Sequence, residues 1–236
     1  VAFDETKIEA FKDPKVREAI TLAFDAEEAG IVGAAGMCTV ADSILPSNCF
    51  GYKSTGAYLN GTDDDIAKAK ELLKEAGYEN GFDIALQVRD RDGALGEYLQ
   101  AALTKIGLNC TLEEMEFQNY RAAMSDGLIT ATIGEIQTDN SGEPLNAYVY
   151  FTTSQSTMCG TIPDDDFNAL CAKATATVNE AEREKLVKQI QEEAYDFSYR
   201  YWLYEKQKGW VYRAGVLPDD FEAYYGNVPM GFRFCK

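Results

Sequence analysis

Residues 11–25 read FKDPKVREAITLAFD and predict one amphipathic helix with a clear start. Asp13 can accept hydrogen bonds from the first N–H groups of the helix, and Pro14 suits the first helical position. One apolar side-chain set then recurs with a helical period: Val16, Ala19, Ile20, Ala23 and Phe24. One face of this helix should therefore be buried.

The rest of the chain alternates between helix and strand patterns. Gly30, Gly33 and Gly36 are expected to mark the loosening of the first helix into a loop. Further helices are expected over residues 63–77, 95–106, 117–124, 167–178 and from 179 onward. Strands are expected over residues 1–3, 82–88, 108–112 and 128–134. This order predicts an α/β fold with a mixed sheet and flanking helices.

The composition is that of a soluble globular protein with a strong negative charge. The 236 residues are 46% hydrophobic and 26% charged, and 39 acidic against 22 basic residues give a formal charge of -17. Such a field repels nucleic-acid phosphates and anionic lipid, so we expect no nucleic-acid partner. No apolar stretch approaches the length needed to span a bilayer.

Six cysteines are spread along the chain without a CxxC or other tight metal-binding spacing, namely Cys38, Cys49, Cys110, Cys159, Cys171 and Cys235. This spacing favours disulfides over zinc, with no cofactor or metal expected. The short loops give a preference for the pairs Cys38–Cys49 and Cys159–Cys171. An alternative stays open, in which Cys110 and Cys171 are buried apolar thiols.

The chain contains no histidine, which excludes Ser-His and Cys-His nucleophile pairs and imidazole bases. Paired carboxylates of the kind used by glycoside hydrolases remain as an enzymatic alternative, suggested only by the abundance of acids.

Aromatic side chains cluster in two extended stretches that include Tyr148 and Trp202. Such rings can line a ligand cleft, although packing in strands would also explain them.

Four ordered segments together resemble the family 5 extracellular solute-binding proteins of bacterial dipeptide and oligopeptide importers, over the C-terminal half of such a protein. The matching side chains are Asp13, Val16, Arg17, Ala19, Ile20, Ala23 and Asp25; Ala69, Lys70, Leu72, Leu73, Glu75, Ala76, Gly77 and Tyr78; Gln100, Leu103, Ile106, Gly107 and Leu108; and Phe167, Leu170, Ala174, Arg183 and Leu186. Their order and spacing make the set specific.

The resemblance implies a fold and a role. Two lobes of a periplasmic-binding-protein-like fold close on a peptide or related solute, which an ABC permease in the membrane then receives. This chain resembles the second lobe, with residues 1–205 forming the lobe and 206–236 the crossover strand and C-terminal tail. Because it starts at Val1 inside an expected strand, we expect a fragment that lacks the N-terminal lobe. A monomeric, non-enzymatic protein is implied, either periplasmic or a cell-surface lipoprotein.

The resemblance also implies binding residues. Residues 134–144, GEIQTDNSGEP, match a segment whose aspartate receives the ligand's ammonium group; Asp139, beside Asn140, is the corresponding carboxylate, and Glu135 replaces the usual tryptophan. Arg89 or Arg91 lies where some dipeptide-binding members place an arginine for the ligand carboxylate, although both could be solvated loop residues.

Two functions from other classes remain as alternatives to solute capture. One is the carboxylate-based glycoside hydrolase, and the other is a surface adhesion or signalling module derived from the same lobe. The absence of histidine and the four ordered segments favour capture over both.

Overall fold

The computed structural model describes residues 1–47, 49–56, 58–135, 144–145, 165–197, 202–207 and 213. Its main sheet has four strands in the order β1 (Ala2–Phe3), β5 (Ala131–Thr132), β3 (Asp83–Arg89) and β4 (Asn109–Met115). β3 runs parallel to β4 and β5, whereas β1 is antiparallel to β5, so the predicted mixed sheet is confirmed.

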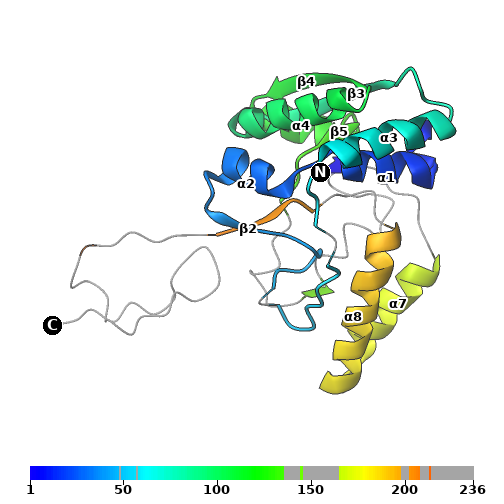
Figure 1. Cartoon of the computed structure of the whole chain (residues 1–236). Helices are drawn as coiled ribbons and strands as arrows, with labels where there is room; N and C mark the ends of the chain where they lie inside the picture. The colour runs from blue at the N-terminus through cyan, green and yellow to red at the C-terminus, as the bar shows by residue number, and fades with distance from the viewer. Residues whose placement is uncertain are drawn as a thin grey trace.

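Helices cover both faces of this sheet (Figure 1). α1 (Pro14–Leu22), α3 (Asp63–Glu75) and α4 (Gly93–Lys105) pack on one face, where Ile84, Leu86 and Val88 of β3 enter the largest apolar cluster. α5 (Phe117–Ser125) packs on the opposite face. Short 3-10 helices, η1 (Glu9–Lys12) and η2 (Asp90–Asp92), precede α1 and α4.

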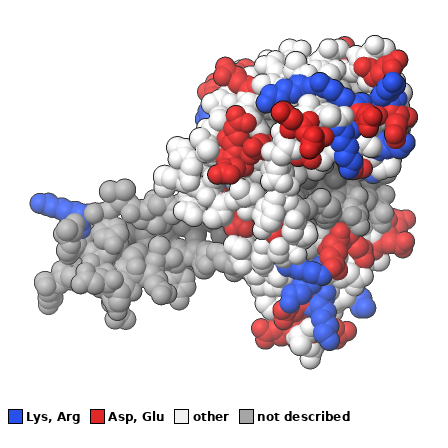
Figure 2. Space-filling model, viewed as in Figure 1, with Lys and Arg blue, Asp and Glu red and all other residues white. Residues whose placement is uncertain are grey.

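α1 starts as its sequence predicts. Asp13 is the N-cap and accepts a hydrogen bond from the Lys15 backbone N–H at 2.8 Å, and Pro14 occupies the first helical position. Val16, Ala19 and Ile20 are buried. On the outer side, Lys15 and Glu75 form an ion pair between α1 and α3. Figure 2 shows Lys and Arg side chains interspersed with Asp and Glu over the upper right of the molecule.

The expected loop at the three glycines is wrong for Gly30 and Gly33, which lie inside α2 (Ala26–Ala34). An added Cβ at Gly30 would lie 2.5 Å from Cys38 Sγ, and one at Gly33 would overlap the Tyr204 hydroxyl. The glycines therefore provide close approach for a second sheet, not flexibility. That sheet pairs β2 (Cys38–Val40) with β6 (Tyr204–Lys206) in antiparallel orientation.

A second apolar cluster lies outside the main sheet. α7 (Asp165–Ala176) and α8 (Glu180–Phe197) form a pair that projects from the sheet layers (Figure 1) and packs on the 41–56 loop through Ile44 and Leu45. Gln191 of α8 is buried and donates to Gly51 O at 2.6 Å while accepting from the Ser43 hydroxyl at 2.9 Å. This buried amide ties the loop to α8.

Cys38 and Cys171 are free thiols, so the preferred pairs Cys38–Cys49 and Cys159–Cys171 are wrong. The Cys38 side chain lies against Gly30 of α2, whereas Cys49 packs on the apolar cluster of α7 and α8. The two side chains therefore pack in different parts of the fold. Burial raises the pKa of Cys110 to about 11 and that of Cys171 to about 12. The alternative of inert apolar thiols therefore describes these two residues. Cys159 and Cys235 lie outside the described residues.

Candidate functional site

The carboxyl ends of the parallel strands β3, β4 and β5 meet at one edge of the main sheet. Ligands of open α/β sheets bind outside such an edge, because the loops that follow the strands converge there. We use the name carboxyl edge for Arg89, Arg91, Asp92, Glu135 and Lys206. β3 contributes its last residue, η2 the next two, the segment after β5 contributes Glu135, and β6 contributes Lys206.

Arg89 is held in place at the carboxyl edge. Its Nε donates to Asp92 Oδ2 at 2.5 Å, and the two side chains are only 13% and 17% exposed. The guanidinium also lies 6.0 Å from the centre of the Tyr120 ring, a cation–π distance. Its Nη2 is buried and has no hydrogen-bond partner among the described residues. A buried N–H group without an acceptor is costly, so this edge of the guanidinium is suited to bind an anion.

Arg91 has a different environment. Its side chain is 57% exposed, and Nη2 lies 3.0 Å from Glu135 Oε2. Glu135 Oε1 in turn lies 3.8 Å from Lys206 Nζ. Exposed pairs of this kind contribute roughly 0 to 1 kcal/mol each, so they link η2, the segment after β5 and β6 without fixing them rigidly. The alternative of a solvated loop arginine therefore fits Arg91 but not Arg89.

Tyr204 brings β6 close to the same edge. Burial raises its pKa to about 12, with smaller contributions from the nearby Cys38, Asp92 and Glu135. Its ring packs over Gly33 of α2. The phenol is therefore neutral at physiological pH and acts as a packing element beside the ion pairs.

Of the other predicted binding residues, the structure describes Trp202. Trp202 is half-buried and packs against the α7–α8 cluster. Asp139, Asn140 and Tyr148 lie outside the described residues, although their segment begins next to Glu135 at the carboxyl edge. Of the six predicted residues, the structure thus brings Arg89 and Arg91 to one site.

Sequence reasoning missed Asp92 and Tyr120 as parts of this region, and it placed Tyr204 only within the aromatic stretch that includes Trp202. One local signal could have indicated Asp92, because an acid three residues after an arginine can pair with it when the chain turns. Tyr120 was assigned only to a short helix, and its position beneath Arg89 depends on the packing of α5 on the sheet. Tyr204 belongs to a strand far along the chain, so no local pattern places it near Gly33.

A second polar cluster surrounds the buried Asp42 in the 41–56 loop. Tyr52 donates its hydroxyl to Asp42 Oδ1 at 2.7 Å, Ser54 donates to Oδ2, and Thr55 donates to the Asp42 backbone carbonyl. Burial raises the pKa of Asp42, but the hydrogen bonds from Ser54 and Tyr52 outweigh it and leave the pKa below its ordinary value. Because these side chains satisfy the carboxylate, the cluster stabilises the loop.

Neither a metal centre nor a membrane segment is found in the part of the chain that the structure describes. No group of three cysteine or acidic side chains there could hold a metal ion. None of the helices in that part combines the length and hydropathy needed to cross a membrane.

The family of bacterial extracellular solute-binding proteins, family 5 Middle, matches residues 2–158. Heme-binding protein A of Haemophilus influenzae is 29% identical over 201 residues, which cover 81% of this chain and 36% of that protein. The glutathione-binding protein GsiB of Escherichia coli strain K12 is 32% identical over 120 residues, or 50% of this chain and 22% of that protein. The chain thus spans well under half the length of either relative.

Solved structures agree with the fold. The periplasmic binding protein DppA from Helicobacter pylori, in complex with the peptide STSA, aligns with a TM-score of 0.74 and 26% identity. The alignment covers 86% of this chain and 40% of that one. HbpA2 from Haemophilus parasuis also gives a TM-score of 0.74, with 27% identity over 84% of this chain and 40% of that one. The predicted periplasmic-binding-protein-like fold is confirmed.

Proposed function

Because this chain belongs to the family 5 bacterial extracellular solute-binding proteins, we propose that it forms the second lobe of the substrate-capturing component of an ABC importer. Residues 1–205 would form the lobe and residues 206–236 the crossover strand and tail. The other lobe of the longer protein would complete the cleft, and a membrane permease would receive the ligand. The family match favours this non-enzymatic role over a carboxylate-based hydrolase and over an adhesion or signalling module.

The ligand class follows from Arg89, which is the single observation that carries the proposal at the level of the site. Its guanidinium is fixed by Asp92 and Tyr120, yet Nη2 has no acceptor among the described residues. A carboxylate offers two oxygens in one plane and matches the paired donors of a guanidinium. We therefore propose a peptide or related solute with a free carboxylate, bound with its carboxylate on Arg89.

Relatives support such a ligand class. Their names record glutathione for GsiB, the peptide STSA for the Helicobacter pylori protein and haem for the Haemophilus influenzae protein. Each of these molecules carries at least one carboxylate. For the opposite end of a peptide, the proposal assigns the ammonium group to Asp139, with Asn140 and Tyr148 nearby; Arg91 and Trp202 would border the cleft.

The proposal places the protein outside the cytoplasmic membrane, in agreement with the extracellular character of the family. Within that location it would act as a monomer without a cofactor, either free in a periplasm or anchored as a lipoprotein. Fractionation of the native host, followed by mass analysis of the mature N-terminus, would distinguish the two forms.

Calorimetry on the natural full-length protein tests the function. The panel is the dipeptide Met-Leu, the peptide Ser-Thr-Ser-Ala, reduced glutathione and haem. We expect saturable one-to-one binding of at least one of the three peptides. If the folded protein bound none of the four compounds, solute capture of this class would be wrong. Binding of haem alone would keep the capture role and reject the peptide class.

A further inference from the structure

Asp92 occupies the N-cap position of α4, but it does not act as a cap. An aspartate at this position normally accepts hydrogen bonds from the first backbone N–H groups of the helix. The Asp92 side chain makes no such bond, and its Oδ2 lies instead 2.5 Å from Arg89 Nε. The Asp92 carboxylate therefore does not cap α4, and it accepts a hydrogen bond from Arg89 instead.

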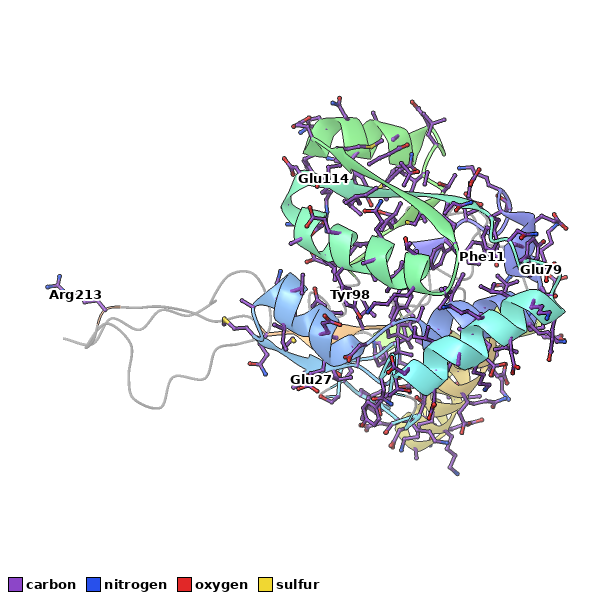
Figure 3. All side chains as sticks on the ribbon, turned by 45° about the horizontal axis from the view of Figure 1, so that its top comes forward. Phe11, Glu27, Glu79, Tyr98, Glu114 and Arg213 are labelled. Carbon is purple, nitrogen blue, oxygen red and sulfur yellow. The ribbon has the colours of Figure 1, made fainter. Side chains whose placement is uncertain are left out.

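Glu114 of β4 lies where a negative charge can compensate for the missing cap. A Cβ added to Gly93, the first residue of α4, would lie 2.8 and 2.9 Å from the two carboxylate oxygens of Glu114. An acid at the start of a helix is stabilised by the helix dipole and the free N–H groups. Figure 3 labels Glu114 close to α4. Asp92 is thus available for a different role.

The arrangement around Arg89 leaves one side of the guanidinium for a ligand. Asp92 occupies Nε, the Tyr120 ring lies 6.0 Å from the guanidinium carbon, and Nη2 has no partner among the described residues. Arg91 competes weakly for Asp92, since its Nε lies 3.7 Å from Oδ1 and its side chain is largely exposed. The orientation of Arg89 therefore depends on Asp92.

From these contacts we infer that Asp92 is a positioning residue that makes the site selective for ligands with a free carboxylate. It holds the Arg89 guanidinium by Nε, so that the Nη1–Nη2 edge faces a planar anion with both donors. The inference rests on the proposed function, because it concerns the same ligand. Asp92 itself contacts the arginine and not the solute.

Two matched substitutions in the natural full-length protein test the inference. Asp92→Asn keeps the size of the side chain but removes its charge, and Asp90→Asn makes the same change at an exposed residue of η2. The probes are Met-Leu and its C-terminal amide, and glutathione and its glycyl ethyl ester, measured by calorimetry. The readout is the ratio of affinities for the free acid and its blocked form, which a merely structural role would not change.

In the wild-type protein and in Asp90→Asn, we expect the free acid to bind about tenfold or more tightly than its blocked form, as a charge-assisted hydrogen-bond pair requires. In Asp92→Asn the ratio should fall to about threefold or less. An equal loss of affinity for both forms in Asp92→Asn, or an unchanged ratio, would overturn the positioning role and leave the proposed function intact. A folded wild-type protein that bound neither free acid would overturn both.

A ligand-independent measurement completes the test. The Nε–H of Arg89 should exchange slowly with water in the wild-type protein and in Asp90→Asn, because Asp92 accepts its hydrogen bond. In Asp92→Asn it should exchange faster, as followed by nitrogen-15 NMR of the arginine side chains. Equal exchange rates in all three proteins would show that Asp92 does not hold Arg89.

Discussion

The hydroxyl of Tyr98 satisfies both backbone polar groups of Asp25. It accepts a hydrogen bond from the Asp25 N–H at 2.8 Å and donates one to the Asp25 carbonyl at 2.9 Å. Asp25 lies between α1 and α2, whereas Tyr98 belongs to α4, and Figure 3 shows the tyrosine between α4 and α2. One side chain therefore fixes the junction of two helices against a third.

Tyr98→Phe should lower the stability of the lobe by about 1 to 3 kcal/mol, because it leaves the Asp25 N–H without its acceptor. The Asp25 carbonyl loses one of two hydrogen bonds, since it also accepts from the Ala29 N–H at 3.0 Å. The measurement is thermal unfolding of the natural full-length protein followed by calorimetry. Tyr78→Phe is the matched control, because the Tyr78 ring packs edge-on against Phe82 and its hydroxyl has no hydrogen bond among the described residues. Equal shifts in the two variants would show that the Tyr98 hydroxyl does not stabilise the junction.

Gly33→Ala should destabilise the protein, although alanine favours a helix over glycine by up to about 1 kcal/mol. The reason is that the new Cβ would overlap the Tyr204 hydroxyl and lie 3.1 Å from Leu95 Cδ2. Unfolding temperatures of Gly33→Ala, Tyr204→Phe and the double variant form a cycle that isolates this contact. The double variant should recover part of the loss. If the effects of the two single substitutions simply added in the double variant, the alanine side chain introduced in Gly33→Ala would not contact the Tyr204 hydroxyl.

The sequence predicts an element well when the interactions that form it join residues close together along the chain. Asp13 and Pro14 specify the start of α1 by interactions within four residues, so that helix was predicted and confirmed. The role of Gly33 depends on Tyr204, which lies far away in the sequence, so α2 was mistaken for a loop. Arg89 was identified through a family resemblance. Its orientation was not, because Tyr120 and Asp92 act on it only after β3, η2 and α5 have packed.

Gln87→Met should loosen the contact between β3 and β5. These strands share one Cα pair, Leu86 with Ala131, and Gln87 supplements it by accepting from the Thr130 N–H at 2.8 Å. Loss of a buried acceptor should cost about 1 to 3 kcal/mol in the free energy of unfolding. Urea denaturation measures the change. The same substitution at the exposed Gln118 should have little effect, and an equal effect at both positions would contradict the role of the amide.

Asp42 should make the protein sensitive to acid. Burial raises the pKa of this carboxyl, but hydrogen bonds from Ser54 and Tyr52 outweigh the effect, so the folded-state pKa lies below 3.8. The unfolded chain therefore binds a proton first as the pH falls. The stabilisation is complete above the unfolded pKa and is lost as the pH drops through the folded value.

Thermal unfolding between about pH 6 and pH 2.5 checks this sign. The unfolding temperature of the wild-type protein should fall more steeply in this range than that of Asp42→Asn, which cannot titrate at that position. Asp64→Asn, at an exposed position of α3, should retain the wild-type slope. If the unfolding temperature of Asp42→Asn fell with pH as steeply as that of the wild-type protein, Asp42 would not be the source of the acid sensitivity.

Comparing substitutions of Arg89 and Arg91 distinguishes a ligand contact from a surface ion pair. The two residues lie at the same edge of the sheet, but the Arg89 side chain is 13% exposed and the Arg91 side chain is 57% exposed. Lysine keeps the charge but loses the paired donors of the guanidinium. Arg89→Lys should therefore weaken glutathione or Met-Leu binding to the full-length protein about tenfold or more, whereas Arg91→Lys should change it less than about threefold. Calorimetry at two salt concentrations distinguishes the effects, since only the exposed pair is strongly screened. If Arg91→Lys caused the larger loss, the ligand carboxylate would have to be assigned to the exposed arginine.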